Sequence, residues 1–230
     1  SKKIVYETVY FVNTAQWETV NAYAWNGNNN SWPGVALEAT GEVILGQTVY
    51  SFTAEQGAYT NIIFNNGDDK KTADLNWVAD NYYVYCSEVW TTQTSVEAVL
   101  QRWIGTWTIV GDAALLGTHW DPEYVAYDMQ LQEDGTLQLV LENILLLANT
   151  YEYKAAKDHT LDVSVPQANN LLSINKDGFY NVTFTLNPFT STLTAGAELL
   201  SEYKYIPSVT LVGDMNDWTQ KMDIFEVAED

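Results

Sequence analysis

Short runs in which apolar and polar residues alternate recur along the chain, and clusters of Gly, Asn and Asp separate them. Alternation with a period of two places successive side chains on opposite faces of a β-strand. Many short strands joined by turns at this spacing predict antiparallel β-sandwiches. Hydrophobic residues make up 47% of the sequence, enough to fill such cores. We therefore predict an all-β protein of immunoglobulin-like sandwiches. The predicted strands are 4–12, 20–25, 48–53, 61–64, 73–77, 82–86, 107–111, 129–132, 137–141, 150–155 and 181–186.

The length of 230 residues accommodates two sandwiches, because single domains commonly have about 100–150 residues. We place the first at residues 1–88 and the second at 105–204. Between them, residues 89–104 are predicted to form a short helical linker that packs on a neighbour, because apolar residues recur there at helical spacing after Thr and Ser. These apolar residues are Val96, Val99, Leu100 and Trp103.

Residues 205–230 carry an echo of the start of the second sandwich. Thr-Ile-Val-Gly-Asp at 108–112 precedes Trp120, and Thr-Leu-Val-Gly-Asp at 210–214 precedes Trp218. Internal similarity of this kind indicates repeated structural units. The tail is therefore either the start of a further repeat or a segment docked on the second sandwich.

The charge of the chain excludes several classes of partner. Ten basic and 30 acidic residues give a net charge of −20. Such a surface repels nucleic acid and anionic membranes but leaves neutral polysaccharides open as ligands. The single cysteine, Cys86, excludes an intrachain disulfide, and no apolar run of about 18 residues is present to span a bilayer. The first residues lack the apolar region of a signal peptide, so an exported form would have lost its signal.

The segment 20–25 followed by 26–34 is the strongest candidate for a binding site. In a strand, Val20, Ala22 and Ala24 share one face, and Tyr23 and Trp25 share the other with Asn21. A polar, turn-rich loop follows and ends in Trp32. Aromatic planes stack on the apolar C–H faces of glucose rings while polar groups bind the hydroxyls. The alternative is that both strand aromatics fill the core and that Trp32 is a local plug against Pro33.

Ordered motifs in the first sandwich resemble the starch-binding modules of carbohydrate-binding family twenty-six, over residues 6–86. The motifs are Val9-Tyr10-Phe11-Val12-Asn13-Thr14-Ala15-Gln16-Trp17, Val20-Asn21-Ala22-Tyr23-Ala24-Trp25, Ser31-Trp32-Pro33-Gly34, Ile63-Phe64-Asn65-Asn66-Gly67 and Lys71-Thr72-Ala73-Asp74-Leu75. The resemblance implies a sugar platform of Tyr23, Trp25 and Trp32 and a polar contact from Lys71, where Gln is common in the family. We assign Trp17 and Trp77 to packing.

The second sandwich resembles the X-type accessory modules of amylopullulanases and the modules of starch-binding outer-membrane lipoproteins of gut bacteria, over residues 107–195. The motifs are Ile109-Val110-Gly111-Asp112, Trp120-Asp121-Pro122, Met129, Asp134-Gly135 and Tyr151-Glu152-Tyr153-Lys154. The resemblance implies glucan contacts from Trp120 and Lys154. Relatives often carry a second Trp soon after the Lys, where this chain has His159. The alternative is that Trp120 is structural and the module is a spacer.

No pattern of catalytic residues stands out. The acidic pairs at 68–69 and 133–134 lie in turn-like segments, whereas a glycosidase needs two carboxylates across a cleft. The only histidines, His119 and His159, are too few for a convincing zinc site or triad. We predict no enzyme activity, no cofactor and no metal site, and we keep a glycoside hydrolase fragment as a weaker hypothesis.

Together these patterns favour a monomeric, non-catalytic α-glucan-binding segment of a larger secreted or cell-surface amylase or starch-adherence protein. The rival hypothesis is a set of protein-interaction or spacer modules in a multimodular surface protein. We expect no nucleic-acid partner and no membrane insertion in this segment.

Overall fold

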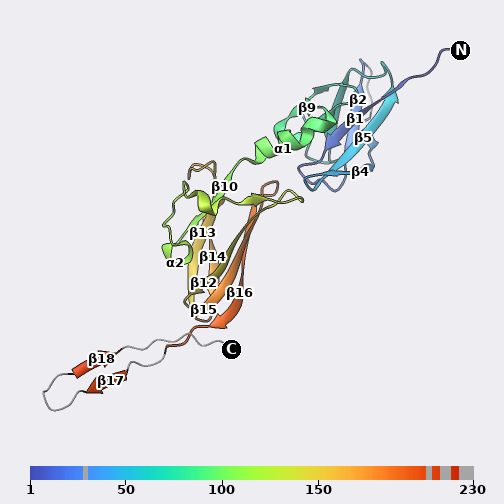
Figure 1. Cartoon of the computed structure of the whole chain (residues 1–230). Helices are drawn as coiled ribbons and strands as arrows, with labels where there is room; N and C mark the ends of the chain where they lie inside the picture. The colour runs from blue at the N-terminus through green and yellow to red at the C-terminus, as the bar shows by residue number, and fades with distance from the viewer. Residues whose placement is uncertain (28–30, 206–208, 213–218, 223–230) are drawn as a thin grey trace. The chain divides into compact units, whose positions relative to one another are not determined.

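The computed structural model describes residues 1–27, 31–205, 209–212 and 219–222 (Figure 1). The chain divides into two compact units, each described separately below. The first unit comprises Ser1–Gly105, Gln132–Thr136 and Pro188–Thr190. The second unit comprises Thr106–Leu131, Leu137–Asn187 and Ser191–Asp230.

The first unit is a sandwich of two sheets that share one core. A five-stranded sheet has the order β4-β5-β1-β8-β9, and a four-stranded sheet has the order β3-β2-β6-β7. The pairing is antiparallel except between β1 and β8, which run parallel. The strands are β1 Tyr6–Val12, β2 Asn21–Trp25, β3 Val35–Ala36, β4 Ala39–Ile44, β5 Gln47–Glu55, β6 Asn61–Asn65, β7 Leu75–Asn76, β8 Tyr82–Val84 and β9 Val89–Thr91.

The core of this sandwich consists of the apolar members of the alternating runs. Val9 and Phe11 of β1 meet Ile62 and Phe64 of β6 across the two sheets, all four with an exposed fraction of 0%. The centroids of the Phe11 and Phe64 rings lie 4.7 Å apart. The alternation in the sequence therefore determines which face of each strand is buried, as predicted.

Helix α1 packs on the outer surface of the five-stranded sheet. It spans Val96–Ile104, after the 3-10 turns η1 at Tyr85–Ser87 and η2 at Gln93–Ser95. Its buried stripe contacts the sheet residues that face away from the main core. This second cluster contains Val12, Val49, Tyr82, Val84, Val96 and Leu100. The predicted helix and its packing are present, but β9, in the segment predicted as linker, is a strand paired with β8.

The second unit is another sandwich, and all its strand pairs are antiparallel. Its sheets have the orders β10-β13-β14 and β11-β12-β15-β16. Tyr153 of β13 and Phe184 of β15 join the sheets, with ring centroids 5.2 Å apart. The strands are β10 Trp107–Gly111, β11 Gln130–Leu131, β12 Leu137–Leu146, β13 Asn149–Lys157, β14 Ser164–Ile174, β15 Gly178–Asn187 and β16 Thr192–Glu202; the helical segments are α2 Ala113–Leu116 and η3 Val125–Tyr127.

Two short strands follow the second sandwich. Strand β17, Val209–Val212, pairs antiparallel with β18, Thr219–Met222. Trp218, which completes the predicted echo, lies outside the described residues. Of the helices in the described ranges, none is long and apolar enough to cross a membrane. The domain boundaries assigned from the sequence remain predictions.

Candidate functional site

Strand β2 presents its small and its large side chains on opposite faces. Ala22 and Ala24 are 1% and 4% exposed and lie in the core shared by the two sheets. Tyr23 and Trp25 alternate with them and lie half-buried on the outer face of the four-stranded sheet. The prediction that the alanines face the core is confirmed, and the alternative with both aromatic residues inside is wrong.

The loop after β2 brings Trp32 beside Tyr23. Gly34, two residues after Trp32, has φ of +91°, and a Cβ atom there would lie 2.1 Å from the carbonyl oxygen of Ala22. Only glycine allows the loop to pass this close to β2. The Gly34 N–H also donates to the Ser31 carbonyl at 2.9 Å, which closes the turn. The Trp32 side chain remains 45% exposed, so it is not a buried plug.

Tyr23, Trp25 and Trp32 form a continuous aromatic surface, which we call the aromatic platform. The centroid of the Tyr23 ring lies 5.6 Å from that of Trp25, with 40° between the planes. It lies 5.5 Å from that of Trp32, with 53° between the planes. These separations are in the range of favourable ring pairs, so each ring helps to hold its neighbour. The inclined planes make the platform angled rather than flat.

Lys71 reaches the edge of the platform from the turn after β6. Its Nζ atom lies 5.7 Å from the centroid of the Trp32 ring, within the range of a cation–π interaction. The next residue, Thr72, fixes the backbone here: its N–H donates to the Phe64 carbonyl at 2.8 Å, and its hydroxyl accepts from the Phe64 N–H at 3.1 Å. The four residues predicted from the first sandwich therefore lie together.

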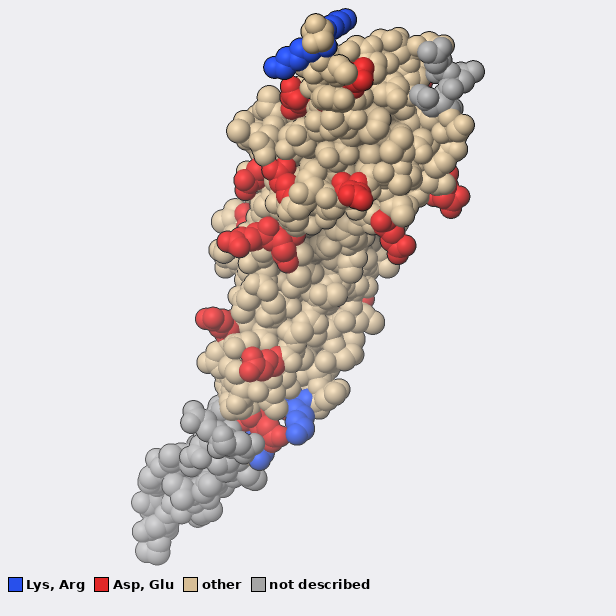
Figure 2. All heavy atoms as spheres, turned by 90° about the vertical axis from the view of Figure 1, so that its right-hand side faces the viewer, with Lys and Arg blue, Asp and Glu red and all other residues tan. Residues whose placement is uncertain are grey.

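The arrangement suits a neutral ligand with flat apolar faces. Exposed and half-buried rings offer area for dispersion contacts and for release of water, and Lys71 offers hydrogen-bond donors at the rim. Acidic side chains are spread over the face shown in Figure 2, and basic ones are few on it. With the net charge of −20, this distribution repels anionic polymers but leaves uncharged ones unaffected.

The chain is similar to one family model and to a solved structure. Residues 9–77 match the family model described as starch-binding module 26. The match confirms the family resemblance predicted for the first sandwich. No curated protein matches the chain. Among solved structures, a pullulanase from Bacillus acidopullulyticus is similar at 30% identity and a TM-score of 0.34; the match covers 39% of this chain and 11% of the pullulanase.

The two other tryptophans in the matched module serve packing, as predicted. Trp17 stacks on Phe11, with ring centroids 5.4 Å apart, and packs against the core. Trp77 also packs against the core and donates from Nε1 to Glu7 Oε2 at 2.9 Å. Both are half-buried, so exposure alone does not separate them from Tyr23 and Trp25. Their ring partners do separate them: Trp17 and Trp77 contact rings of the packed interior, and neither contacts a ring of the platform.

One carboxylate of each acidic pair, at 68–69 and 133–134, accepts hydrogen bonds within a local turn. Asp69 lies in the turn of the module before Lys71, and a hydrogen bond from the Asn66 side chain lowers its pKa. Asp134 accepts from the Thr136 hydroxyl at 2.6 Å and from its N–H at 3.0 Å, which lowers the pKa of Asp134. Among the residues that the structure describes, no group of three His, Cys, Asp or Glu is placed to hold a metal ion.

Trp120 and Lys154, the residues predicted in the second unit, lie near the end of β10. The Trp120 N–H donates to the Gly111 carbonyl at 3.1 Å, and Lys154 of β13 is the strand partner of Val110. Trp120 is half-buried. The Lys154 ammonium donates to the Gln167 carbonyl at 2.9 Å, so part of its donor capacity is already used. Unlike the aromatic platform, this region shows no ring partner for Trp120 among the described residues.

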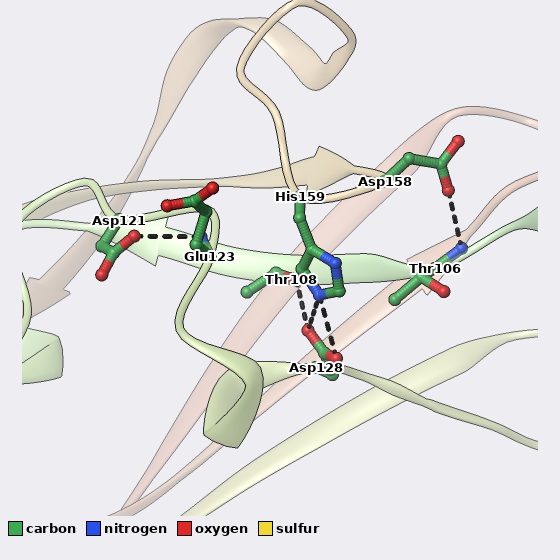
Figure 3. Close-up of polar contacts among 7 residues, drawn as sticks. All are labelled: Thr106, Thr108, Asp121, Glu123, Asp128, Asp158 and His159. Carbon is green, nitrogen blue, oxygen red and sulfur yellow. Dashed lines mark hydrogen bonds and ion pairs between the residues drawn. The ribbon is translucent and has the colours of Figure 1, made fainter.

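The side chain of His159 lies against the carboxylate of Asp128 (Figure 3). His159 Nε2 lies 2.8 Å from Asp128 Oδ1 and 3.1 Å from Oδ2. The Thr108 hydroxyl donates to the same carboxylate. The carboxylate thus ties the loop after β13 to β10. This cluster fixes the local backbone of the second unit and has no counterpart in the aromatic platform.

Sequence reasoning assigned no role to Asn65, which contacts the loop of Trp32. It is the last residue of β6 and has an exposed fraction of 0%. The signal in the sequence was a polar residue directly after the apolar run Ile62-Ile63-Phe64, followed by Asn-Gly. That pattern also marks an ordinary turn, so its role could be seen only from its contacts.

Proposed function

We propose that the first unit binds α-glucan, including starch and maltooligosaccharides, and does not hydrolyse it. The observation that carries the proposal is the aromatic platform within the region that matches a starch-binding module. Glucose rings would stack their C–H faces on the indole and phenol planes, and Lys71 would bind hydroxyls. The angle between the rings suits the curved chain of an α-glucan better than the flat chain of cellulose.

The affinity of one such site is modest. Each stacked ring contributes on the order of 1 kcal/mol beyond area burial. Two or three such contacts, together with the buried apolar area and hydrogen bonds to the hydroxyls, give dissociation constants of about micromolar to millimolar. Several sites on one chain raise the avidity for a polymer without any new contact. We therefore propose that the chain is a monomeric segment of a larger amylase or starch-adherence protein, active outside the cell or on its surface, where insoluble starch is found.

The test uses the full chain in starch-gel affinity electrophoresis and in calorimetry with maltoheptaose. The wild type should be retarded by starch and should bind maltoheptaose but not a β-1,4-linked glucan of the same length. Trp32→Ala should weaken binding about fivefold, the equivalent of ~1 kcal/mol. Tyr6→Ala, which removes an aromatic side chain that is 61% exposed on β1, is the matched control and should bind like the wild type. Unchanged retardation of Trp32→Ala would disprove this site.

We also propose a second glucan contact at Trp120 and Lys154. It is tested in a variant whose aromatic platform has been weakened. In the Trp32→Ala background, Trp120→Ala and Lys154→Ala should lower the residual retardation by starch. If they leave it unchanged, the second unit is a spacer or an interaction module. Release of reducing sugar from starch by the full chain would contradict the proposal that the protein is not an enzyme.

A further inference from the structure

Asn65 is a buried amide on the side of the sheet that carries the platform. In β6 it pairs with Asn21 of β2, while Ile63 pairs with Tyr23. Ile62 and Phe64, which alternate with Ile63 and Asn65 along β6, face the core. The Asn65 side chain therefore points to the opposite face. There Tyr23 is half-buried, yet the exposed fraction of Asn65 is 0%. Other segments therefore cover Asn65.

The amide of Asn65 joins two of these covering segments. Its Nδ2 donates to the carbonyl oxygen of Pro33 at 3.0 Å. Its Oδ1 accepts from the backbone N–H of Gly67 at 2.9 Å. These two partners determine which way the amide faces, because the N–H of Gly67 can only donate a hydrogen bond and the carbonyl of Pro33 can only accept one. Both ends of this side chain are thus committed to backbone groups of different loops.

The contact to Pro33 lies one residue from the exposed indole of Trp32. On the other side of Pro33, Gly34 approaches the backbone of β2 closely. Two consecutive residues after Trp32 are therefore fixed, Pro33 by the amide of Asn65 and Gly34 by its close approach to Ala22. Gly34 permits the loop to lie close to β2, and the hydrogen bond from the Asn65 amide fixes the position of the loop along the sheet. Without the amide, the loop would have to be ordered when a ligand binds, at a cost in conformational entropy.

We propose that Asn65 is a positioning residue that holds Trp32 in the aromatic platform; this inference rests on the proposed glucan-binding function. Asn65 itself is buried and makes no contact with sugar. Its effect on affinity passes through the backbone of Pro33 to the orientation of Trp32.

The test compares two buried asparagines in the full chain. Asn13 is 4% exposed, and its amide also makes two bonds to backbone, donating to the Trp17 carbonyl at 2.9 Å and accepting from the Trp17 N–H at 3.1 Å. Asn65→Ala and Asn13→Ala should both lower Tm, because each removes two buried hydrogen bonds. Only Asn65→Ala should weaken maltoheptaose binding, by about fivefold, which is the loss of one stacked ring.

A double-mutant cycle separates positioning from general destabilisation. In the Trp32→Ala background, Asn65→Ala should cause no further loss of affinity, because the side chain through which it acts is gone. Asn65→Asp keeps an acceptor for Gly67 but lacks the donor to Pro33, so it should weaken binding like Asn65→Ala even if the alanine variant folds poorly.

The outcomes for the two proposals differ. A wild-type chain that does not bind maltoheptaose overturns the proposed function. A wild-type chain that binds, with Asn65→Asp equally tight, overturns only the role of Asn65. Equal weakening by Asn13→Ala, or additive losses in the cycle, would show a general effect on stability and would also overturn it.

Discussion

The ammonium nitrogen of Lys71 lies 5.7 Å from the centroid of the Trp32 ring, at the rim of the aromatic platform. A cation over an indole contributes about 0.5–1 kcal/mol at an exposed site. Lys71→Met removes the charge and the donors proposed to bind hydroxyls but keeps the aliphatic stem, and we expect it to weaken maltoheptaose binding about two- to fivefold in calorimetry, the loss of one hydrogen bond of about 0.5–1 kcal/mol. The control is Lys70→Met, since Lys70 is paired with Asp69 at 3.9 Å and its side chain is 64% exposed. Equal effects of the two variants would contradict a specific role for Lys71.

Gly34 and Gly41 allow the effect of a close contact to be separated from the effect of a positive φ. Their φ values are +91° and +88°, but a Cβ atom would collide with the Ala22 carbonyl only at Gly34; at Gly41 nothing lies within 4 Å. Gly41→Ala should cost about 1–2 kcal/mol for the left-handed conformation. Gly34→Ala should cost about 3 kcal/mol or more, and it should also weaken glucan binding because the Trp32 loop must move. Chemical denaturation and calorimetry measure the two effects, and equal losses of stability would contradict the contact.

Trp77 should affect stability but not sugar affinity. Its Nε1 donates to Glu7 Oε2 at 2.9 Å, and its ring lies 5.9 Å from those of Phe52 and Tyr59. Trp77→Phe keeps an aromatic ring and loses the donor, so we expect a loss of about 1–2 kcal/mol in unfolding experiments. Glu7→Gln keeps an acceptor for the indole and should cost less. Weaker maltoheptaose binding by Trp77→Phe would show that the platform extends further than the three rings described here.

The sequence predicted the parts of the fold that depend on alternation between neighbouring residues. In β2, the small residues Ala22 and Ala24 face the core and Tyr23 and Trp25 face outward, as the period of two implied. The sequence analysis predicted no strand where β14 and β16 lie. Strand β14 contains Pro166, and β16 contains Gly196 within an Ala- and Leu-rich run, so neither has the alternation of a half-buried strand. Both are edge strands of their sheets, where such residues are tolerated.

The sequence could not show how the Trp32 loop is held. Asn65 and Pro33 are 32 residues apart, and their bond joins a side-chain amide to a backbone carbonyl. No local pattern encodes such a contact, because it depends on how β2 and β6 pair. The close approach of Gly34 to Ala22 depends on the same pairing. Local patterns therefore identified the three platform residues as candidates, and the family resemblance favoured them over the buried alternative, but neither could show how the loop is positioned.

The carboxylate of Asp128 should stabilise the second unit locally. It accepts hydrogen bonds from Thr108, whose exposed fraction is 0%, and contacts His159 (Figure 3). The side chains of Asp128 and His159 are 28% and 35% exposed, so solvent screens the pair, and we expect Asp128→Ala to cost about 1 kcal/mol. Hydrogen exchange should speed up at the amides of β10 and β13. Asp121→Ala, which removes an acceptor for the Glu123 N–H in an exposed turn, is the control and should leave those amides unchanged.

Tyr83 should make the first unit sensitive to alkaline pH. Burial raises its pKa to about 12, with smaller contributions from Glu88 and Tyr85, whereas an unfolded tyrosine titrates near pH 10. Above about pH 10 the unfolded chain therefore loses a proton that the folded chain retains, so stability falls as pH rises and continues to fall until about pH 12. Tyr83→Phe keeps the ring against Trp90, at 5.4 Å between centroids, and should make the decline of Tm between these pH values shallower. Burial also raises the pKa of Tyr82, so part of the decline should remain. Tyr6→Phe changes an exposed ring and should follow the wild-type curve; an equally steep decline in Tyr83→Phe would contradict the role of Tyr83.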